Sequence, residues 1–246
     1  MPLREFRADL HIHTCLSACA DKTMLPAAII KQAKLRGLDI IGICDHNSAQ
    51  NVSAVKKAGE REGVGVLGGI EITSREEVHI MGFFEDDNNL EKMQQVIYEN
   101  LSGENKEDTF GEQLIADEDD KIIGFNPKLL IGASNLPIDE IVGLVYSLGG
   151  MAIASHIDRE AFGIIGQLGF MPEGLALDAV EVSANCPSNK ISNYKGYGFP
   201  VVRFSDAHFL PDIGKSFSTC LLNEPSFAEF AMALKGIEGR KVKFLI

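Results

Sequence analysis

The sequence lacks several features that would place it in other classes of protein. Its 246 residues contain no tryptophan and no CxxC pair, and no apolar run approaches the roughly 18–20 residues that a membrane-spanning helix needs. The five cysteines are odd in number, and in a chain of this length they are typical of reduced thiols rather than of a disulfide framework. The N-terminal segment has no apolar signal core followed by a small-residue cleavage site, so we expect a cytoplasmic protein without a membrane partner.

Positive charge is also scarce. The chain has 23 Lys and Arg residues against 35 Asp and Glu residues, which gives a net charge of −12. Nucleic acids and anionic lipid surfaces carry the same sign, so we expect no long duplex nucleic acid as a partner. A phosphate-bearing substrate would have to be captured locally, and a bound multivalent cation is the obvious means.

Short apolar runs alternate with helical patterns along the chain, which predicts β/α units around a mainly parallel sheet. Hydrophobic residues make up 45% of the chain, near the globular average, so wholesale disorder is excluded. The patterns predict helices over 26–36, 50–62, 137–148 and 227–234, and seven strands over 6–13, 38–44, 64–70, 78–84, 151–155, 179–184 and 200–205.

The segment 85–135 breaks this pattern. It carries the charged stretches GENKED (103–108) and DEDDK (117–121), which are typical of a solvated surface insertion. Its LIADEDDKII portion predicts two short strands around a polar turn, and hence a small cap beside the active face. No linker divides the chain, so we expect one domain, 1–246, in which 85–135 is an insertion and not an independent domain.

The six histidines are the main chemical signal, because all of them fall at the ends of predicted strands. His11 and His13 are two residues apart on the first strand, so both side chains should leave the same face. Glu71 ends the third strand, where a tight return to His79 would bring these two side chains together. The carboxyl ends of parallel strands converge on one face of a β/α barrel, where active sites are built. The donors placed on this rim are His11, His13, His46, Glu71, His79, His156, Asp206 and His208.

So many imidazoles beside carboxylates on one rim would be destabilising unless something neutralises and organises them. Divalent metal does both, and imidazole with carboxylate suits zinc, iron and manganese. The lack of clustered thiolates disfavours an iron–sulfur cluster or a four-cysteine structural site. Eight donors exceed one tetrahedral site, so we expect two to three divalent metal ions.

The motifs that carry these donors are HIH (11–13), DHN (45–47), GIEIT (69–73) with VHIMG (78–82), ASHID (154–158) and SDAH (205–208). In this order they closely resemble the motif series of the PHP (polymerase and histidinol phosphatase) superfamily. They are most similar to its stand-alone bacterial phosphoesterases, in which a variable insertion separates the VHIMG and ASHID elements. The resemblance runs from Asp9 to His208 and implies an α/β fold, namely a distorted seven-stranded (β/α) barrel.

The resemblance also implies a trinuclear metal centre in which Glu71 bridges two metals. It assigns one metal to His11, His13, Glu71 and Asp206, a second to Glu71, His79 and His156, and a third to His46, His208 and one loop residue.

The ninth ligand, from the loop after the HIH motif, has two candidates. Relatives place an Asp or His five or six residues after the second histidine, and this chain has Cys19 six residues after His13. Counted back from the helix start at Pro26, the Asp of the relatives corresponds to Asp21. A helix start is a firmer reference than a loop of variable length, so we predict Asp21, with Cys19 as the alternative because a thiolate is a good zinc ligand.

Two neighbours of the motifs each have two interpretations. Asp45 either orients a histidine or a metal-bound water, or it caps a helix N-terminus. Arg159 either contacts phosphate as a bidentate donor or forms a surface salt bridge. Glu71 and Asp45 are therefore the candidate catalytic carboxylates, and Arg159 is the candidate substrate-binding residue.

These residues and the resemblance together predict a metal-dependent phosphoesterase. A metal-bridged hydroxide would be its nucleophile, because metal-bound water has a pKa of about 7 in favourable zinc sites. The resemblance implies small phosphomonoesters, nucleotides or oligonucleotide ends as substrates. A metal-dependent hydrolase of C–N or C–O bonds could use the same rim. A non-catalytic metal-binding module is the last alternative, and its expected signature is the loss of several ligands.

Overall fold

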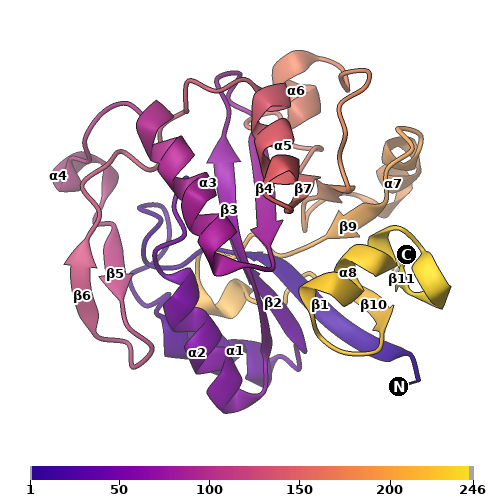
Figure 1. The fold of residues 1–246 in the computed structure, drawn as a ribbon, viewed down its shortest axis with the longest axis horizontal. Coiled ribbons are helices and arrows are strands. Elements are labelled where there is room, and N and C mark those ends of the chain that lie inside the picture. Colours follow the sequence, from indigo (N-terminus) through magenta and orange to yellow (C-terminus); the bar gives the residue numbers. More distant parts are fainter. Residues whose placement is uncertain (1, 244–246) are drawn as a thin grey trace.

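A single sheet organises the molecule. The computed structural model describes residues 2–243, so the two ends of the predicted domain 1–246 lie outside the described part. Within that part, the sheet has nine strands in the order β11-β10-β1-β2-β3-β4-β7-β8-β9 (Figure 1). The strands are β1 (Arg4–Ile12), β2 (Ile40–Ile43), β3 (Gly65–Thr73), β4 (His79–Phe84), β7 (Met151–Ala154), β8 (Ala179–Val182), β9 (Val201–Arg203), β10 (Ser218–Leu222) and β11 (Lys241–Lys243).

The number of strands differs from the seven that the sequence predicts. Each predicted run contains a strand, but β10 and β11 extend the sheet beyond β1. The first half of β1 pairs antiparallel with β10, and only its second half pairs with β2. The two added strands are five and three residues long, which is too short for hydrophobic periodicity to distinguish them from loops.

The chain after β9 returns to β1 and nearly closes the sheet into a barrel. Ala207 forms a parallel bridge with Ile12. The amide of His13 donates to the carbonyl of Ala207 at 3.0 Å, and the amide of Ala207 donates to the carbonyl of His11 at 3.1 Å. The SDAH motif is therefore fixed beside the HIH motif.

One strand runs against its neighbours. β4 is antiparallel to both β3 and β7, whereas β1, β2 and β3 are parallel, as are β7, β8 and β9. A tight return after β3 pairs Thr73 with His79. The start of β4 therefore lies on the rim where the other strands end, and His79 shares that rim with Glu71.

A β-bulge in β1 directs both histidines of the HIH motif to the mouth of the barrel. Leu10 packs in the apolar cluster inside the barrel, whereas Ile12 packs on the outer, helix-covered face, although residues two apart in a regular strand share a face. The register with β2 shifts between Asp9 and Ile12, and such a bulge re-aims side chains. His11 and His13 alternate with Ile12 and therefore face the mouth.

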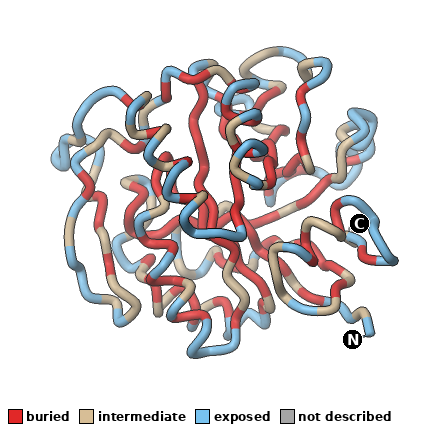
Figure 2. The backbone as a smooth tube through the Cα atoms, in the orientation of Figure 1, coloured by how far each residue is buried: buried red, intermediate tan, exposed pale blue. Residues whose placement is uncertain are grey.

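Apolar side chains fill the interior below the mouth, and the strands are buried along most of their length (Figure 2). Phe83 occupies the centre of this packing. Gly42 and Gly69 leave room for its ring, since a Cβ on either would come within 2.8 or 2.7 Å of it. The filled interior confines any ligand site to the rim.

Helices cover the outer face of the sheet, where α1, α2, α3 and α5 contribute to the main core cluster. The helices are α1 (Pro26–Leu35), α2 (Val52–Glu62), α3 (Asp87–Asn100), α4 (Glu107–Phe110), α5 (Ile138–Ser147), α6 (Ile164–Leu168), α7 (Ser188–Lys195) and α8 (Phe227–Leu234). No helix within residues 2–243 is long and apolar enough to cross a membrane.

The segment 85–135 is only partly the solvated insertion that its charges predict. Its first part is α3, which buries Leu90, Met93 and Ile97 in the main core cluster because these residues line one helix face. The remainder contains α4 and a hairpin of β5 (Leu114–Ala116) and β6 (Ile122–Phe125), where the sequence predicts two short strands. This hairpin lies on the opposite side of the molecule from α7 and α8 (Figure 1).

Candidate metal centre

The ends of the strands bring all eight predicted rim donors together around Glu71. The Oε1 atom of Glu71 lies 3.2 Å from His11, 3.1 Å from His79 and 3.5 Å from His156. Its Oε2 atom lies 3.4 Å from His13 and 3.1 Å from His46. One buried carboxylate thus contacts five of the six histidines.

Four of these side chains form a cage at the mouth of the barrel. The Nε2 atoms of His11 and His13 lie 3.3 Å apart, and they are 3.3 and 3.2 Å from Oδ1 of Asp206. Tetrahedral ligands bound at about 2.0–2.1 Å from zinc are separated by about 3.3–3.4 Å, so these three atoms have the spacing of one face of a tetrahedral site. Glu71 completes the cage with Oε1 at 3.2 Å from His11 and Oε2 at 3.4 Å from His13.

Several buried polar atoms near Glu71 make no hydrogen bond. They include Oε1 of Glu71 and the Nδ1 atoms of His46 and His79, although each of these nitrogens is 3.1 Å from a Glu71 oxygen. Close approach without hydrogen-bond geometry is expected where lone pairs are directed at a common point rather than at each other. Buried polar atoms are otherwise nearly always satisfied, so these orphaned atoms fit a divalent cation.

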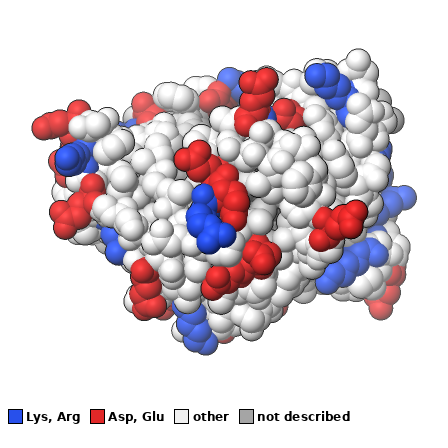
Figure 3. All heavy atoms as spheres, turned by 90° about the horizontal axis from the view of Figure 1, so that it is seen from above, with Lys and Arg blue, Asp and Glu red and all other residues white. Residues whose placement is uncertain are grey.

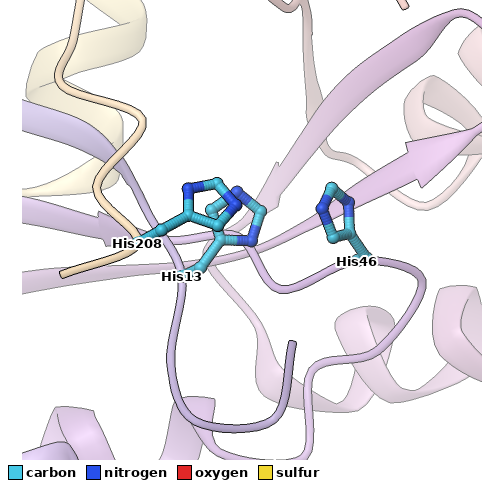
Figure 4. A group of neighbouring side chains, drawn as sticks. All are labelled: His13, His46 and His208. Carbon is cyan, nitrogen blue, oxygen red and sulfur yellow. The ribbon is translucent and has the colours of Figure 1, made fainter. Parts of the chain in front are cut away.

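A second group of donors lies beside this cage. His13, His46 and His208 come from the end of β1, the loop after β2 and the loop after β9, and their rings face one another (Figure 4). The ring of His13 lies 4.2 Å from that of His208 and 4.5 Å from that of His46, measured between centroids. Ligand atoms of the three residues lie within 4.8 Å of one another.

The structure does not bring Asp21 into this group. The carboxylate of Asp21 accepts hydrogen bonds from the backbone and hydroxyl of Thr23 in an exposed turn. Only its backbone approaches the site, because the Asp21 amide donates to the carbonyl of His208 at 2.8 Å. Cys19 instead lies against the imidazoles of His46 and His208. The loop turns the carboxylate of Asp21 outward two residues after Cys19, so Asp21 as a metal ligand stays a prediction that this structure does not support.

The carboxylates and the imidazoles at the rim have shifted pKa values. Burial alone would raise the pKa of Glu71, but the imidazoles of His79 and His11 hold it well below its ordinary value. Burial lowers the pKa of His79 to about 4. The pKa of His11 is instead raised well above its ordinary value by Glu181 and Glu71 despite its burial, and that of His46 is raised to about 10. Divalent ions bind neutral imidazole, so a metal would displace the protons of His11 and His46.

Glu181 supports two of the histidines, although it belongs to none of the histidine-bearing motifs. It is fully buried in β8, and Nδ1 of His11 lies 2.9 Å from its Oε2. The same oxygen accepts the backbone amide of His156 at 3.0 Å. A His11 that donates through Nδ1 presents its Nε2 lone pair to the cage. The one signal in the sequence was a single acidic residue inside the apolar run AVEVSA (179–184).

Asp45 supports His13 through an intermediate hydroxyl. Ser17 donates to Oδ1 of Asp45 at 2.7 Å, and its Oγ lies 3.0 Å from Nδ1 of His13. Asp45 also accepts the amide and hydroxyl of Thr14, both at 2.7 Å. The helix-cap alternative for Asp45 is wrong, because α2 is capped at Asn51. Asp45 therefore orients the HIH segment.

Arg159 lies at the opening of the site. Its Nη1 atom donates to Oδ2 of Asp206 at 2.6 Å, on the side of that carboxylate away from the cage, and its side chain is 40% exposed. The opening is a cavity of about 220 Å³, lined also by Phe162 and by Ile131 of the 101–135 segment. Phe162 stacks on His79 with 4.4 Å between ring centroids. The salt bridge of Arg159 is thus part of the site rather than remote from it.

The backbone is unusual at the same rim. His156 and Asp206 have φ values of +28° and +50°, and Asn47, next to His46, has a φ of +50°. Side chains other than glycine rarely adopt such values, and they persist where the surroundings impose them, often at functional sites.

A nearly closed barrel with a multi-histidine donor set at its mouth defines a class of metal-binding barrel proteins. Within this class, the chain belongs to the PHP domain family, whose model matches residues 9–168. The family that the motif series indicated is therefore confirmed.

Three proteins illustrate the similarity. A phosphoribosyl 1,2-cyclic phosphate 1,2-diphosphodiesterase from Eggerthella lenta is 33% identical over 79 residues, which is 30% of this chain and 29% of that protein. The lesion-specific endonuclease PfuEndoQ from Pyrococcus furiosus has a TM-score of 0.75 at 19% identity, covering 97% of this chain and 58% of its own. A candidate metal-dependent phosphoesterase from Bifidobacterium adolescentis, known by its structure, has a TM-score of 0.58 at 19% identity, covering 82% of this chain and 87% of its own. The sequence match to the diphosphodiesterase thus spans under a third of its length, and at 19% identity the two structures show the fold alone.

Proposed function

We propose that the protein is a metal-dependent phosphoesterase. The observation that carries this proposal is the place of Glu71, whose two oxygens lie 3.1–3.5 Å from nitrogens of five histidines. A single carboxylate in this position can join neighbouring metal sites. Two neighbouring metal ions can together bind the anionic oxygens of a phosphate ester. The diphosphodiesterase relative supports the same reaction class.

We assign the donors to two or three ions of zinc, manganese or iron. One ion takes His11, His13, Glu71 and Asp206, a second takes Glu71, His79 and His156, and the remaining donors are His46 and His208. When bound, such ions lower the pKa of water to make it a nucleophile and neutralise phosphate oxygens.

The residues of the chain have separate tasks in this reaction. Glu181 holds His11, and Asp45 holds His13 through Ser17, so that both Nε2 atoms keep their direction. Asp206 places one oxygen in the cage and the other on Arg159. The guanidinium of Arg159, at the opening, can donate to a phosphate oxygen with the nitrogens that do not face Asp206.

We expect small phosphomonoesters, nucleotides or oligonucleotide ends as substrates. The cavity of about 220 Å³ accommodates a phosphate and the adjoining part of its ester. Figure 3 shows Lys and Arg only in separate groups among Asp and Glu on the face that it presents, without a basic track for a polymer. Endonuclease Q, a neighbour in fold, has been solved with a 27-mer duplex that carries an abasic lesion, so duplex DNA belongs in the test.

The test is a screen of the metal-reconstituted protein. Its substrates are phosphomonoesters, phosphodiesters, nucleoside bisphosphates, single-stranded oligonucleotides and a duplex with an abasic site, with Glu71→Gln as the inactive control. We expect hydrolysis of P–O bonds that chelation abolishes and metal restores. Amides and lactones test the alternative of C–N or C–O hydrolysis. Hydrolysis of these compounds, with no hydrolysis of any phosphate ester in the screen, would contradict the proposal. Full metal occupancy without turnover of any of these substrates would favour a non-catalytic module.

A further inference from the structure

Cys19 is a candidate for the third ligand of a metal ion that would be bound by His46 and His208. His46 and His208 face each other across the group shown in Figure 4, and together with His13 they supply nitrogens within 4.8 Å of one another. His13 is already part of the cage with Glu71 and Asp206. Only two imidazoles are then left for a further ion, which is fewer than the three protein ligands that even an open zinc site uses.

The thiol of Cys19 lies beside both of these imidazoles. It is close enough to the imidazoles of both His46 and His208 to interact with each, and it lines the same opening. His46 is itself 93% buried, because its exposed fraction is 7%, and its Nδ1 atom makes no hydrogen bond. This unsatisfied nitrogen, 3.1 Å from Oε2 of Glu71, is an independent sign that a cation belongs on the His46 side of the rim, where Cys19 also lies.

The loop fixes Cys19 from both sides. Two residues before it, Ser17 is held by Asp45 and by the amide of His46, which donates to its Oγ at 3.1 Å. Two residues after it, the amide of Asp21 donates to the carbonyl of His208. The backbone of the loop is thus tied to the segments that carry both histidines, so the place of Cys19 follows from long-range contacts.

We propose that Cys19 is a thiolate ligand which, with His46 and His208, completes a third metal site of mixed sulfur and nitrogen donors. This inference rests on the proposed metal centre and extends it. On binding, the thiol releases its proton to solvent and its sulfur bonds to the metal. Thiolate and imidazole favour zinc or iron(II), whereas manganese prefers oxygen ligands. The three sites therefore differ in metal preference, with the softest one at the exposed edge of the cluster.

Cobalt(II) is the probe for the sulfur bond, because a cobalt–thiolate bond gives a near-ultraviolet charge-transfer band that imidazole and carboxylate do not give. The chelator-stripped protein is reloaded with cobalt. We expect the band in the wild type and in Asp21→Asn, and no band in Cys19→Asp or Cys19→Ser. Elemental analysis should show one metal equivalent lost in Cys19→Ser and regained in Cys19→Asp, with the manganese-to-zinc ratio higher in the latter.

Thiol titration gives a second readout that does not depend on activity. Of the five cysteines, all of which lie in the described part of the chain, only Cys19 is exposed. In the folded apoprotein, an aromatic disulfide reagent should modify one thiol rapidly, and zinc should slow that reaction at least tenfold. Cys19→Ser removes the fast thiol, and the unreactive buried cysteines verify that the variant is folded.

The outcomes separate this inference from the proposed function. A cobalt–thiolate band without hydrolysis of any phosphate ester would contradict the proposed phosphoesterase function and would still support the thiolate site. Turnover with no band in the fully loaded wild type, or with Cys19 equally reactive with and without zinc, would overturn the thiolate site alone. Loss of a metal equivalent in Asp21→Asn but not in Cys19→Ser would return the ligand to Asp21.

Discussion

Two buried carboxylates, Glu71 at the mouth of the barrel and Glu229 in α8, have opposite surroundings. Glu229 accepts two hydrogen bonds from Arg240 and one from the amide of Asn223, all at 2.8 Å. Within residues 2–243, Glu71 forms ion pairs with histidines and with no Lys or Arg, and one of its oxygens is buried without a hydrogen bond. Its neighbours are imidazoles, which are themselves in part unsatisfied.

The contrast separates a structural carboxylate from a functional one. A folded chain normally satisfies a buried charge with its own donors, as it does at Glu229, because an unpaired charge destabilises the protein. At Glu71 the chain instead gathers electron-pair donors around a second electron-pair donor. Such an arrangement is favourable when protons or metal ions join it, and the buried atoms that make no hydrogen bond indicate a metal ion.

The largest expected effect comes from Glu71→Gln. The amide retains the size of the side chain but cannot bridge two cations with comparable charge, so we expect phosphoesterase activity to fall more than about 100-fold and bound metal to decrease. Activity with saturating metal, elemental analysis and thermal unfolding check this. Near-normal turnover in a variant that keeps its metals would contradict the bridging role.

Glu181→Gln should have the next largest effect. Gln retains the shape but lacks the charge that holds His11 from behind, and partners of this kind typically contribute 10–100-fold, roughly, to metal affinity or activity. We expect weaker metal binding and a turnover that rises again at high metal concentration. An activity loss that excess metal does not rescue would mean that Glu181 only supports the packing of β8.

Glu229→Gln is the matched control, because it alters a buried carboxylate outside the site. We expect a loss of about 1–3 kcal/mol of unfolding free energy and unchanged activity in the folded protein. Hydrogen bonds from Arg240 lower the pKa of Glu229 to about 2. A depressed pKa stabilises the fold above the ordinary carboxyl range and ceases to do so as the pH falls towards about 2.

Denaturant unfolding of the wild type and Glu229→Gln at several pH values measures this difference. The gap between the two proteins should be constant near neutral pH and should narrow as the pH is lowered from about 4.5 to about 2. A gap that is independent of pH would show that the variant acts through packing rather than charge.

The sequence predicted the rim well because strand ends are easy to place. Parallel strands deliver their carboxyl ends to one face, so motifs that follow apolar runs meet there. His79 joins them because the tight return after β3 places the start of the antiparallel strand β4 on the same rim. The β-bulge that re-aims His11 was not predictable, because a register shift depends on how β2 pairs with β1.

The loop between His13 and Pro26 is the part of the site for which spacing along the chain is least informative. Spacing along the chain could not choose between Cys19 and Asp21, since the route of the loop is set by contacts with residues far away in sequence. Ser17 is fixed by Asp45, and the amide of Asp21 by His208. Glu181 was missed for a related reason, because no motif links a lone buried acid to a histidine 170 residues away.

Asp206 has surroundings of both kinds, because imidazoles surround one of its oxygens, as at Glu71, and an arginine, Arg159, contacts the other, as at Glu229. One oxygen of Asp206 faces the imidazoles and the other accepts from Arg159, much as Glu229 accepts from Arg240. Arg159 is 40% exposed, however, so water can replace its contact with Asp206, and the bond itself contributes little stability.

The smallest expected effect is therefore that of Arg159→Lys, and it falls on substrate rather than on the fold. Lysine keeps a positive charge near Asp206 but cannot bind two phosphate oxygens in the planar geometry of a guanidinium. We expect KM to rise roughly three- to tenfold, about 0.7–1.4 kcal/mol, with kcat and metal content nearly unchanged. The rise should be larger for a dianionic phosphomonoester than for a monoanionic diester, because the lost contact is to phosphate charge. A fall in kcat at constant KM would instead give Arg159 the same kind of role as Glu181. It would then act by orienting a metal ligand, in this case Asp206, and not by binding substrate.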